Sequence, residues 1–200
     1  MATKPDVFII ESLSPDDEGN GRLEGQVISH ILKLHGKNPI YRYVRNKKDF
    51  AKAVKAFVKS DYRYLHISAH ADRDGIATTN REEISNAVLA RMLGTKVKGR
   101  RIFFSACSII HKEMARAIVP PTQLYSVIGP RKDIGFAEAA VFWPALYHLV
   151  FKRDREGMTR ATLARSLRKV AQMIGVDIGY YSRSAGRKSG FSRNILAAKP

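Results

Sequence analysis

Cysteine is almost absent from this sequence, since Cys107 is the only one among 200 residues. A disulfide bond within the chain is therefore excluded, and the composition fits a reducing compartment. No apolar stretch is long enough to span a bilayer. Acidic residues soon follow the short apolar segment from Val7 to Ile10, which is not the pattern of a secretory signal peptide. We therefore expect a cytoplasmic protein without membrane contact.

Acidic residues are also scarce, because 18 Asp and Glu stand against 35 Lys and Arg and leave a formal net charge of +17. The excess is concentrated toward the end of the chain, where residues 152–200 hold twelve basic and three acidic side chains. A chain this basic is expected to bind polyanions weakly and without sequence specificity at low salt. A solvated basic face followed by a tail explains the same pattern without any partner.

The hydrophobic pattern alternates between short apolar runs and amphipathic segments. Short runs that are nearly all apolar are typical of strands covered on both faces of a parallel sheet. The alternation therefore predicts an α/β protein, a three-layer α/β/α sandwich around a mostly parallel central sheet. The expected strands cover residues 6–11, 40–44, 64–70, 101–107 and 124–129, and the expected helices cover residues 23–34, 47–57, 81–93, 112–119, 136–151 and 159–174.

Prolines and small residues set the expected limits of these elements. Pro120 and Pro121 should stop the helix that begins at Lys112, and Pro144 should kink or divide the helix around it. Residues 180–200 are rich in Ser, Gly, Arg and Lys. We therefore expect one domain over residues 1–179 and a basic C-terminal extension, a mobile arm, over residues 180–200.

Two of the expected strands end in nearly the same way, one on Ser68-Ala69-His70 and the other on Ser105-Ala106-Cys107. The segment between them is long enough for a right-handed crossover to a parallel neighbour. Neighbouring strands lie about 4.8 Å apart, and ligands bind beyond the carboxyl ends of the strands in an open parallel sheet. We therefore expect the imidazole of His70 and the thiol of Cys107 to meet at this edge.

An imidazole beside a thiol raises the thiolate fraction or accepts the thiol proton during attack. Backbone N–H groups around Ala71 and Cys107 would stabilise an oxyanion. The positive end of the helix that starts at Lys112 would also help if its axis points at the sulfur. The expected reaction class is acyl transfer, in which an amide is hydrolysed through a thioester.

Two other interpretations of these residues stay open. A free cysteine at the end of a strand is most often a small buried hydrophobe, and we interpret His66 as a core residue. A metal site made of Cys107, His111 and His70 lacks the paired Cys or His spacing of a closed zinc site. We therefore expect neither a metal nor another cofactor.

Six short motifs follow one another along the chain. Their order and spacing resemble those of clan CD cysteine peptidases, which have the caspase-like fold. The resemblance is nearest to the small bacterial members related to CHAT domains, a group that includes separase-like and clostripain-like enzymes. It extends from about Val7 to Ile174. The motifs are His-Ile-Ser-Ala-His-Ala-Asp (66–72), Asp-Gly-Ile (74–76), Glu-Glu-Ile-Ser (82–85), Phe-Phe-Ser-Ala-Cys-Ser (103–108), Val-Ile-Gly-Pro (127–130) and Ala-Ala-Val-Phe-Trp-Pro-Ala-Leu-Tyr-His-Leu (139–149).

The resemblance implies a role for each matching residue. His70 corresponds to the catalytic base or acid, and Cys107 corresponds to the nucleophile. The family usually has glycine directly after the histidine, and its N–H serves the oxyanion hole. This sequence has Ala71 there, and an alanine donates the same N–H where the backbone avoids conformations reserved for glycine.

The resemblance also implies that a charged group in the first specificity pocket selects the residue before the cut. Asp133, which follows the fifth expected strand, and Asp72 are candidates that would favour Arg or Lys in the substrate. Each of them is also readily explained as an exposed loop carboxylate. Arg131 and Lys132 lie beside Asp133 and would instead select an acidic residue.

The expected function is therefore a bacterial, cytoplasmic cysteine endopeptidase that acts on a protein or peptide substrate and requires no cofactor. Some similar enzymes act only when a partner orders their loops, so a regulatory protein partner fits this expectation. One alternative is a catalytically silent caspase-like module whose basic surface binds nucleic acid or an acidic protein. Another is a thiol hydrolase of a different kind on the same scaffold.

Overall fold

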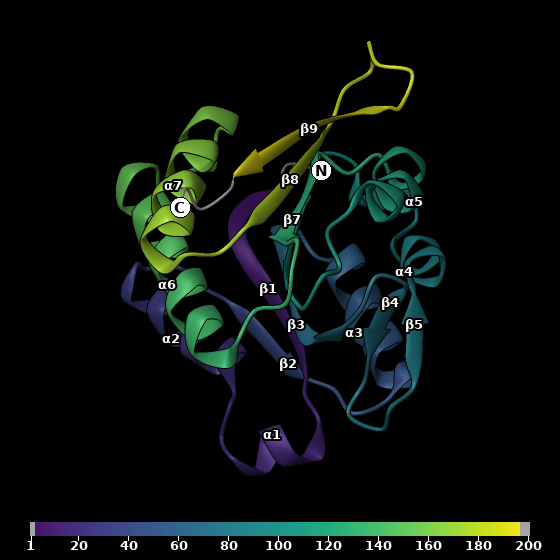
Figure 1. Cartoon of the computed structure of the whole chain (residues 1–200), viewed down its shortest axis with the longest axis vertical. Coiled ribbons are helices and arrows are strands. Elements are labelled where there is room, and N and C mark those ends of the chain that lie inside the picture. The colour runs from purple at the N-terminus through teal and green to yellow at the C-terminus, as the bar shows by residue number, and fades with distance from the viewer. Residues whose placement is uncertain (1–2, 197–200) are drawn as a thin grey trace.

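The computed structural model describes residues 3–196, and one sheet runs through the centre of the molecule (Figure 1). Across the sheet, the first five strands run parallel to one another, and each of the last two pairs antiparallel with the strand before it. In spatial order they are β2 (Ile40–Tyr43), β1 (Lys4–Ser12), β3 (Tyr62–Ala71), β6 (Arg101–Ser105), β7 (Ser126–Pro130), β8 (Ile178–Arg183) and β9 (Phe191–Leu196).

Helices cover both faces of this sheet, which confirms the predicted three-layer α/β/α architecture. One layer contains α2 (Glu24–Leu34), α6 (Phe136–Arg153) and α7 (Arg160–Ile174), and the other contains α3 (Lys47–Lys59), α4 (Asn86–Leu93) and α5 (Lys112–Thr122) (Figure 1). No helix within residues 3–196 has both the length and the apolar character needed to cross a membrane.

Side chains of each strand alternate between the two layers, as the two-residue period of a strand requires. In β3, Tyr64 packs among the residues of α6 and α7, whereas Leu65 and Ile67 pack on the opposite side. Both sets are fully buried. This explains why the strands read as continuous apolar runs in the sequence.

Two helices differ from the sequence prediction at their ends. The helix expected from residue 81 begins at Asn86, because Glu83–Ser85 forms a short strand, β5, that pairs with β4 (Gly75–Ala77) beside the end of β3. Helix α5 continues through both of its prolines to Thr122. Prolines are tolerated there because the carbonyls they leave unpaired belong to Arg116, which is exposed, and to its half-buried neighbour.

Of the two effects expected of Pro144 in helix α6, a kink or a division, the division does not occur. The helix is continuous from Phe136 to Arg153. The carbonyl that loses its partner belongs to Ala140, four residues earlier, and Ala140 is only half-buried. Packing compensates for this loss, since Phe142, Trp143 and most other large side chains of α6 are buried in the core.

The C-terminal arm predicted over residues 180–200 is wrong for the part that the structure describes. Residues 180–196 contribute to β8 and β9, so the boundary expected after residue 179 falls inside a strand. Tyr180 and Tyr181 are buried on opposite faces of the sheet and anchor β8 there. The Ser, Gly, Arg and Lys residues that suggested an arm lie largely in the turn between the two strands. Residues 197–200 lie outside the described part of the chain.

Candidate active site

The strands that carry His70 and Cys107 are parallel neighbours in the sheet, as their sequences predicted. In the β3–β6 register, Ser68 is the partner of Ser105. His70 and Cys107 each stand two residues beyond this pair, at the carboxyl ends of their strands. Both residues line one small pocket of about 60 Å³, together with apolar side chains that include Phe136 at the start of α6. The structure therefore brings the imidazole and the thiol to one cavity.

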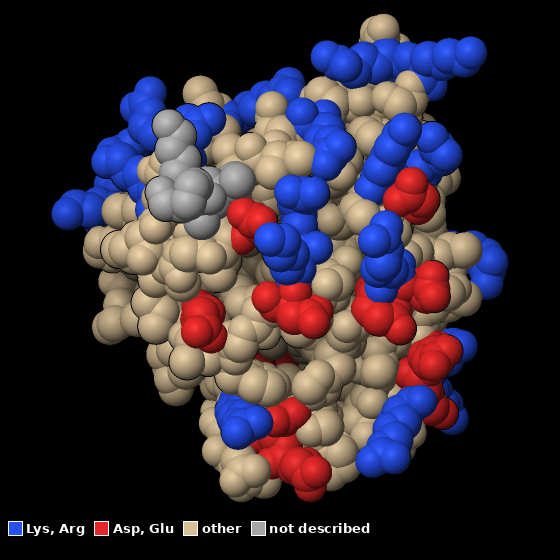
Figure 2. Space-filling view, in the orientation of Figure 1, with Lys and Arg blue, Asp and Glu red and all other residues tan. Residues whose placement is uncertain are grey.

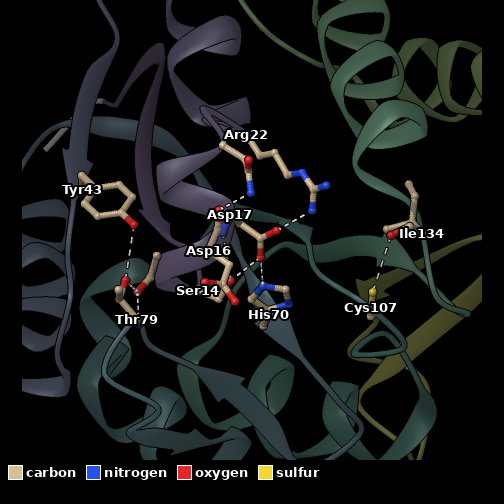
Figure 3. Close-up of polar contacts among 11 residues, drawn as sticks. Ser14, Asp16, Asp17, Arg22, Tyr43, His70, Thr79, Cys107 and Ile134 are labelled. Carbon is tan, nitrogen blue, oxygen red and sulfur yellow. Dashed lines mark hydrogen bonds and ion pairs between the residues drawn. The ribbon is translucent and has the colours of Figure 1, made fainter.

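The imidazole of His70 is held by a carboxylate from a distant part of the chain. Its Nε2 lies 2.7 Å from Oδ2 of Asp17, which belongs to the short helix α1 (Pro15–Gly19) after β1 (Figure 3). The same carboxylate accepts hydrogen bonds from the Ser14 hydroxyl at 2.5 Å and from the Arg22 guanidinium at 2.7 Å. Sequence reasoning missed Asp17, whose only signal was its place at the active edge after the first strand.

The charge on Asp17 is favoured by these contacts. Burial opposes ionisation, but hydrogen bonds from Ser14, His70 and Arg22 outweigh it and lower the pKa of the Asp17 carboxyl. An ionised carboxylate only accepts hydrogen bonds, so Nε2 of His70 is the donor in this contact, and the second ring nitrogen, Nδ1, takes no part in it. In Figure 3 this second ring nitrogen lies on the side of the imidazole toward Cys107. Asp17 thus holds one ring nitrogen of His70, while within residues 3–196 no hydrogen bond joins the other nitrogen to the Cys107 thiol.

The thiol of Cys107 is half-buried, and its hydrogen is directed at a backbone carbonyl. Sγ lies 3.6 Å from the carbonyl oxygen of Ile134, in the loop between β7 and α6 (Figure 3). The next residue, Ser108, has a left-handed φ of +51°, which is unfavourable for a residue with a Cβ. Two contacts hold it there: its N–H donates to Lys132 O at 3.2 Å, and its hydroxyl donates to Asp133 Oδ1 at 2.9 Å.

Neither of the residues expected to supply oxyanion N–H groups, Ala71 and Cys107, has the left-handed backbone that favours glycine. Ala71 is not among the residues with positive φ, so alanine fits this position without strain. The N–H of Asp72 donates to the Gly75 carbonyl at 3.1 Å, and the alternation of an antiparallel ladder directs the Ala71 N–H away from β4. Within residues 3–196, no hydrogen bond uses the N–H of Cys107.

The two candidate specificity carboxylates lie in different places. Asp72 accepts hydrogen bonds from the N–H groups of Asp74 and Gly75 and lines a hollow of about 350 Å³ that His70 also borders. Asp133 lines another hollow, of about 240 Å³, that neither His70 nor Cys107 borders. Of the two, Asp72 is therefore the one beside the imidazole.

A buried carboxylate that the sequence did not single out lies beneath the cavity. Glu24, at the start of α2, is 5% exposed and lines the same pocket as His70 and Cys107. Its Oε2 accepts a hydrogen bond from the Ser105 hydroxyl at 2.7 Å and a longer one from the Ser68 hydroxyl at 3.5 Å. Because these serines are cross-strand partners, Glu24 links the ends of β3 and β6 just before His70 and Cys107.

His66 completes this buried network, in agreement with its interpretation as a core residue. Its Nδ1 lies 3.0 Å from the Tyr147 hydroxyl, and its Nε2 lies 3.6 Å from Oε1 of Glu24. The ring also packs edge-on against Trp143. Within residues 3–196, no group of three or more His, Cys, Asp or Glu side chains has an arrangement suited to a metal ion.

A second buried acid, Glu11, supports the start of α2. It accepts hydrogen bonds from the Gly25 N–H and the Tyr41 hydroxyl, both at 2.7 Å. Burial raises the pKa of Glu11 from its ordinary value of 4.5 to about 7, and the nearby Glu24 adds to the shift, while the two hydrogen bonds oppose it. The region under the cavity therefore contains two carboxyl groups with little access to water.

Comparisons with known proteins locate the fold. No family model matches the chain, and no curated protein matches it. Among solved structures it is similar to iotapain, a secreted C11 cysteine protease from Bacteroides thetaiotaomicron, with a TM-score of 0.55 and 12% identity over 91% of this chain and 67% of that one. At this identity the likeness shows the fold alone. It agrees with the clan-level resemblance, while the nearer resemblance to CHAT-related and clostripain-like members stays a prediction.

Proposed function

We propose that this protein is a cysteine endopeptidase in which Cys107 is the nucleophile, His70 the general base and acid, and Asp17 the residue that orients His70. One observation carries the proposal: His70 and Cys107 line a single cavity, and an ionised carboxylate lies 2.7 Å behind the imidazole. A nucleophile, a base and a third group that orients the base are the parts that covalent acyl transfer requires.

The reaction follows from this arrangement. The sulfur of Cys107 attacks the carbonyl carbon of the scissile peptide, and the thiol proton passes to Nδ1 of His70. When the C–N bond breaks, His70 returns this proton to the leaving amine, and a thioester remains on Cys107. Water then attacks the thioester while His70 accepts its proton, which releases the carboxylic acid product and restores the thiol.

Two backbone groups and one carboxylate complete the proposed site. The N–H groups of Ala71 and Cys107 would stabilise the negative charge that develops on the substrate oxygen. Asp72, in the hollow bordered by His70, would favour Arg or Lys before the cut. Asp133 is the weaker candidate for this role, because the hollow that it lines is bordered by neither His70 nor Cys107.

The setting and partners are part of the same proposal. The single cysteine suits a reducing cytoplasm, and the family resemblance points to a bacterial source and to a protein or peptide substrate. A regulatory partner that moves the loop around Ile134 would free the thiol of Cys107 from its carbonyl contact.

A peptide acyloxymethyl ketone tests the proposal directly, because it alkylates a thiol that is activated as a nucleophile. Wild-type protein should be labelled at Cys107, Cys107→Ala should not be labelled, and His70→Ala should be labelled about 100-fold more slowly. A mixed peptide library should then be cleaved by the wild type and left intact by Cys107→Ala. Equal labelling of wild type and His70→Ala would refute the proposed role of His70.

One observation favours a second candidate, a catalytically silent binding module. The Cys107 thiol donates to the Ile134 carbonyl, and within residues 3–196 no hydrogen bond joins it to His70. A protein that resists the ketone under all conditions and still binds a partner through its basic surface would have this function.

A further inference from the structure

The positive charge of this protein is unevenly distributed over its surface. Figure 2 shows Lys and Arg gathered over α7 and around the β8–β9 hairpin. None of these side chains forms an ion pair with a carboxylate in the described part of the chain. They are exposed, and they are Arg160, Arg165, Arg168 and Lys169 of α7 and Arg183, Arg187, Lys188 and Arg193 of the hairpin.

A groove lies within this basic region, between α7 and β9. Its volume is about 520 Å³. From β9 it is lined by four consecutive residues, Arg193 to Leu196, and consecutive residues of a strand point to opposite faces of the sheet. The groove therefore follows the outer edge of the strand rather than either face. From α7 it is lined by Arg160, Ala161, Ala164 and Arg168, whose spacing places them on one side of the helix.

The edge of β9 is open to another strand. Among the described residues it is the last strand of the sheet, and its single strand neighbour there is β8. Within residues 3–196, the backbone groups of residues 192–196 form no backbone hydrogen bond beyond the β8 ladder. A strand in this position presents a row of N–H and C=O groups that an added chain can pair with.

The groove carries only one sign of charge. Three guanidinium groups line it, from Arg160, Arg168 and Arg193, and no carboxylate of residues 3–196 does. Arg160 is fixed along the strand because its Nη2 donates to the Ser192 hydroxyl at 2.8 Å. Three like charges at one groove repel each other, and carboxylates that bind guanidinium groups in pairs of hydrogen bonds would relieve this repulsion.

We propose that this groove binds an acidic, extended peptide segment of another protein, which adds to β9 as a further antiparallel or parallel strand. Backbone hydrogen bonds to the β9 edge hold the segment, and its alternate Asp or Glu side chains pair with Arg160, Arg168 and Arg193. The small side chains of Ala161 and Ala164 leave room for it, and Ile195, which is 40% exposed, offers an apolar contact.

The lining of the groove favours a peptide over single-stranded nucleic acid. Proteins that bind single strands stack the bases on aromatic side chains, and no aromatic residue in the described part of the chain lines this groove. The N–H and C=O groups of an open strand edge, by contrast, pair with the backbone of an extended peptide. A nucleotide chain has no backbone amides that could pair in this way. The proposal does not depend on catalysis, because β9 and the strands of His70 and Cys107 are separated by β7 and β8.

Fluorescence anisotropy with a labelled octapeptide of alternating Glu and Val tests the proposal on the full chain. The peptide should bind, and replacement of Arg160, Arg168 and Arg193 together by Gln should weaken binding by at least about 100-fold. The matched control replaces Lys55, Arg91 and Arg116, which are exposed on the opposite helical layer, and should weaken binding less than about threefold. Equal losses in the two triple variants would overturn the proposal.

Two further peptides test the strand pairing without any change in the protein. N-methylation of alternate residues blocks one edge of an extended peptide, so methylation of one alternate set should abolish binding and methylation of the other set should preserve it. If neither set matters, or if a single-stranded oligonucleotide of equal charge binds as tightly with the same salt dependence, the groove is a general polyanion surface and the proposal fails. Labelling of Cys107 by the ketone should be the same in both triple variants, which separates this test from that of the endopeptidase.

Discussion

His70 and Asp17 are 53 residues apart in the chain, yet Nε2 of the imidazole lies 2.7 Å from the carboxylate. The two side chains differ in their access to water, since 45% of the His70 side chain is exposed and only 8% of that of Asp17. The buried member therefore fixes the orientation of the exposed one. This relationship leads to the first prediction.

Replacement of Asp17 by Asn should slow alkylation of Cys107 by the ketone by about 100-fold. The amide removes the negative charge that holds the proton on Nε2 of His70, so the tautomer with a free Nδ1 is no longer favoured. Labelling kinetics at pH 7 measure the effect. Asp16→Asn is the matched control, because Asp16 is an exposed neighbour on the same helix, and it should be labelled at the wild-type rate. A wild-type rate for Asp17→Asn would show that the carboxylate does not act through His70.

Replacement of Glu24 by Ala should lower the free energy of unfolding by about 3 kcal/mol. The change leaves the hydroxyls of Ser68 and Ser105 without their buried acceptor and opens a void under the pocket. Glu24→Gln keeps an acceptor oxygen and should lower the free energy of unfolding by less. Urea denaturation measures both, and Gln26→Ala, on the exposed side of α2, should change the midpoint very little. A loss of stability as large in Gln26→Ala would contradict this account.

Replacement of Gly129 by Ala should destabilise the protein by about 1–3 kcal/mol, because the site has no room for a methyl group. A Cβ there would lie 2.7 Å from the Phe104 carbonyl oxygen and 2.8 Å from Cγ1 of Ile110. The backbone oxygen cannot move aside, so Ile110 and the loop behind Cys107 must shift. Thermal unfolding measures the effect. Gly186→Ala, where a Cβ meets nothing within 4 Å, should leave the melting temperature unchanged.

The raised pKa of Glu11 predicts a stability that falls as pH rises from 5 to 8. The unfolded chain releases the proton of this group near pH 4.5, whereas the folded protein keeps it until about pH 7. Folding therefore favours the protonated form of Glu11. Its contribution to the free energy of unfolding is fully present below pH 4.5 and lost above pH 7. It amounts to roughly 3 kcal/mol. The difference in urea stability between pH 5 and pH 8 should shrink in Glu11→Gln, and an unchanged difference would argue against a buried, protonated Glu11.

The sequence predicts the sheet and the place of His70 and Cys107 at one edge of it because both depend on local patterns. Apolar runs identify the strands, and the matching ends Ser-Ala-His and Ser-Ala-Cys place both side chains at the same distance beyond the register pair Ser68 and Ser105. Asp17 is not predicted in this way, because its contact with His70 depends on the path of the chain after β1. Glu24 is missed for a related reason: an acid at the start of a helix normally faces solvent.

The last strands show where composition misleads. Residues 184–190 are polar and basic because they form an exposed turn, and their composition hides the buried pair Tyr180 and Tyr181 just before it. Alternation of strands and helices along the sequence predicts parallel strands. It does not reveal two antiparallel strands, such as β8 and β9, that follow each other at the edge of the sheet. The same edge provides the groove proposed here as a docking site.

The position of β1 between β2 and β3 also bears on how this protein tolerates changes at its beginning. A truncated form without its first twenty residues would lack an interior strand of the sheet and, with Asp17, the group that orients His70. We expect such a form to misfold. Affinity tags and fusion partners are therefore better joined ahead of an intact first strand than used to replace any part of it.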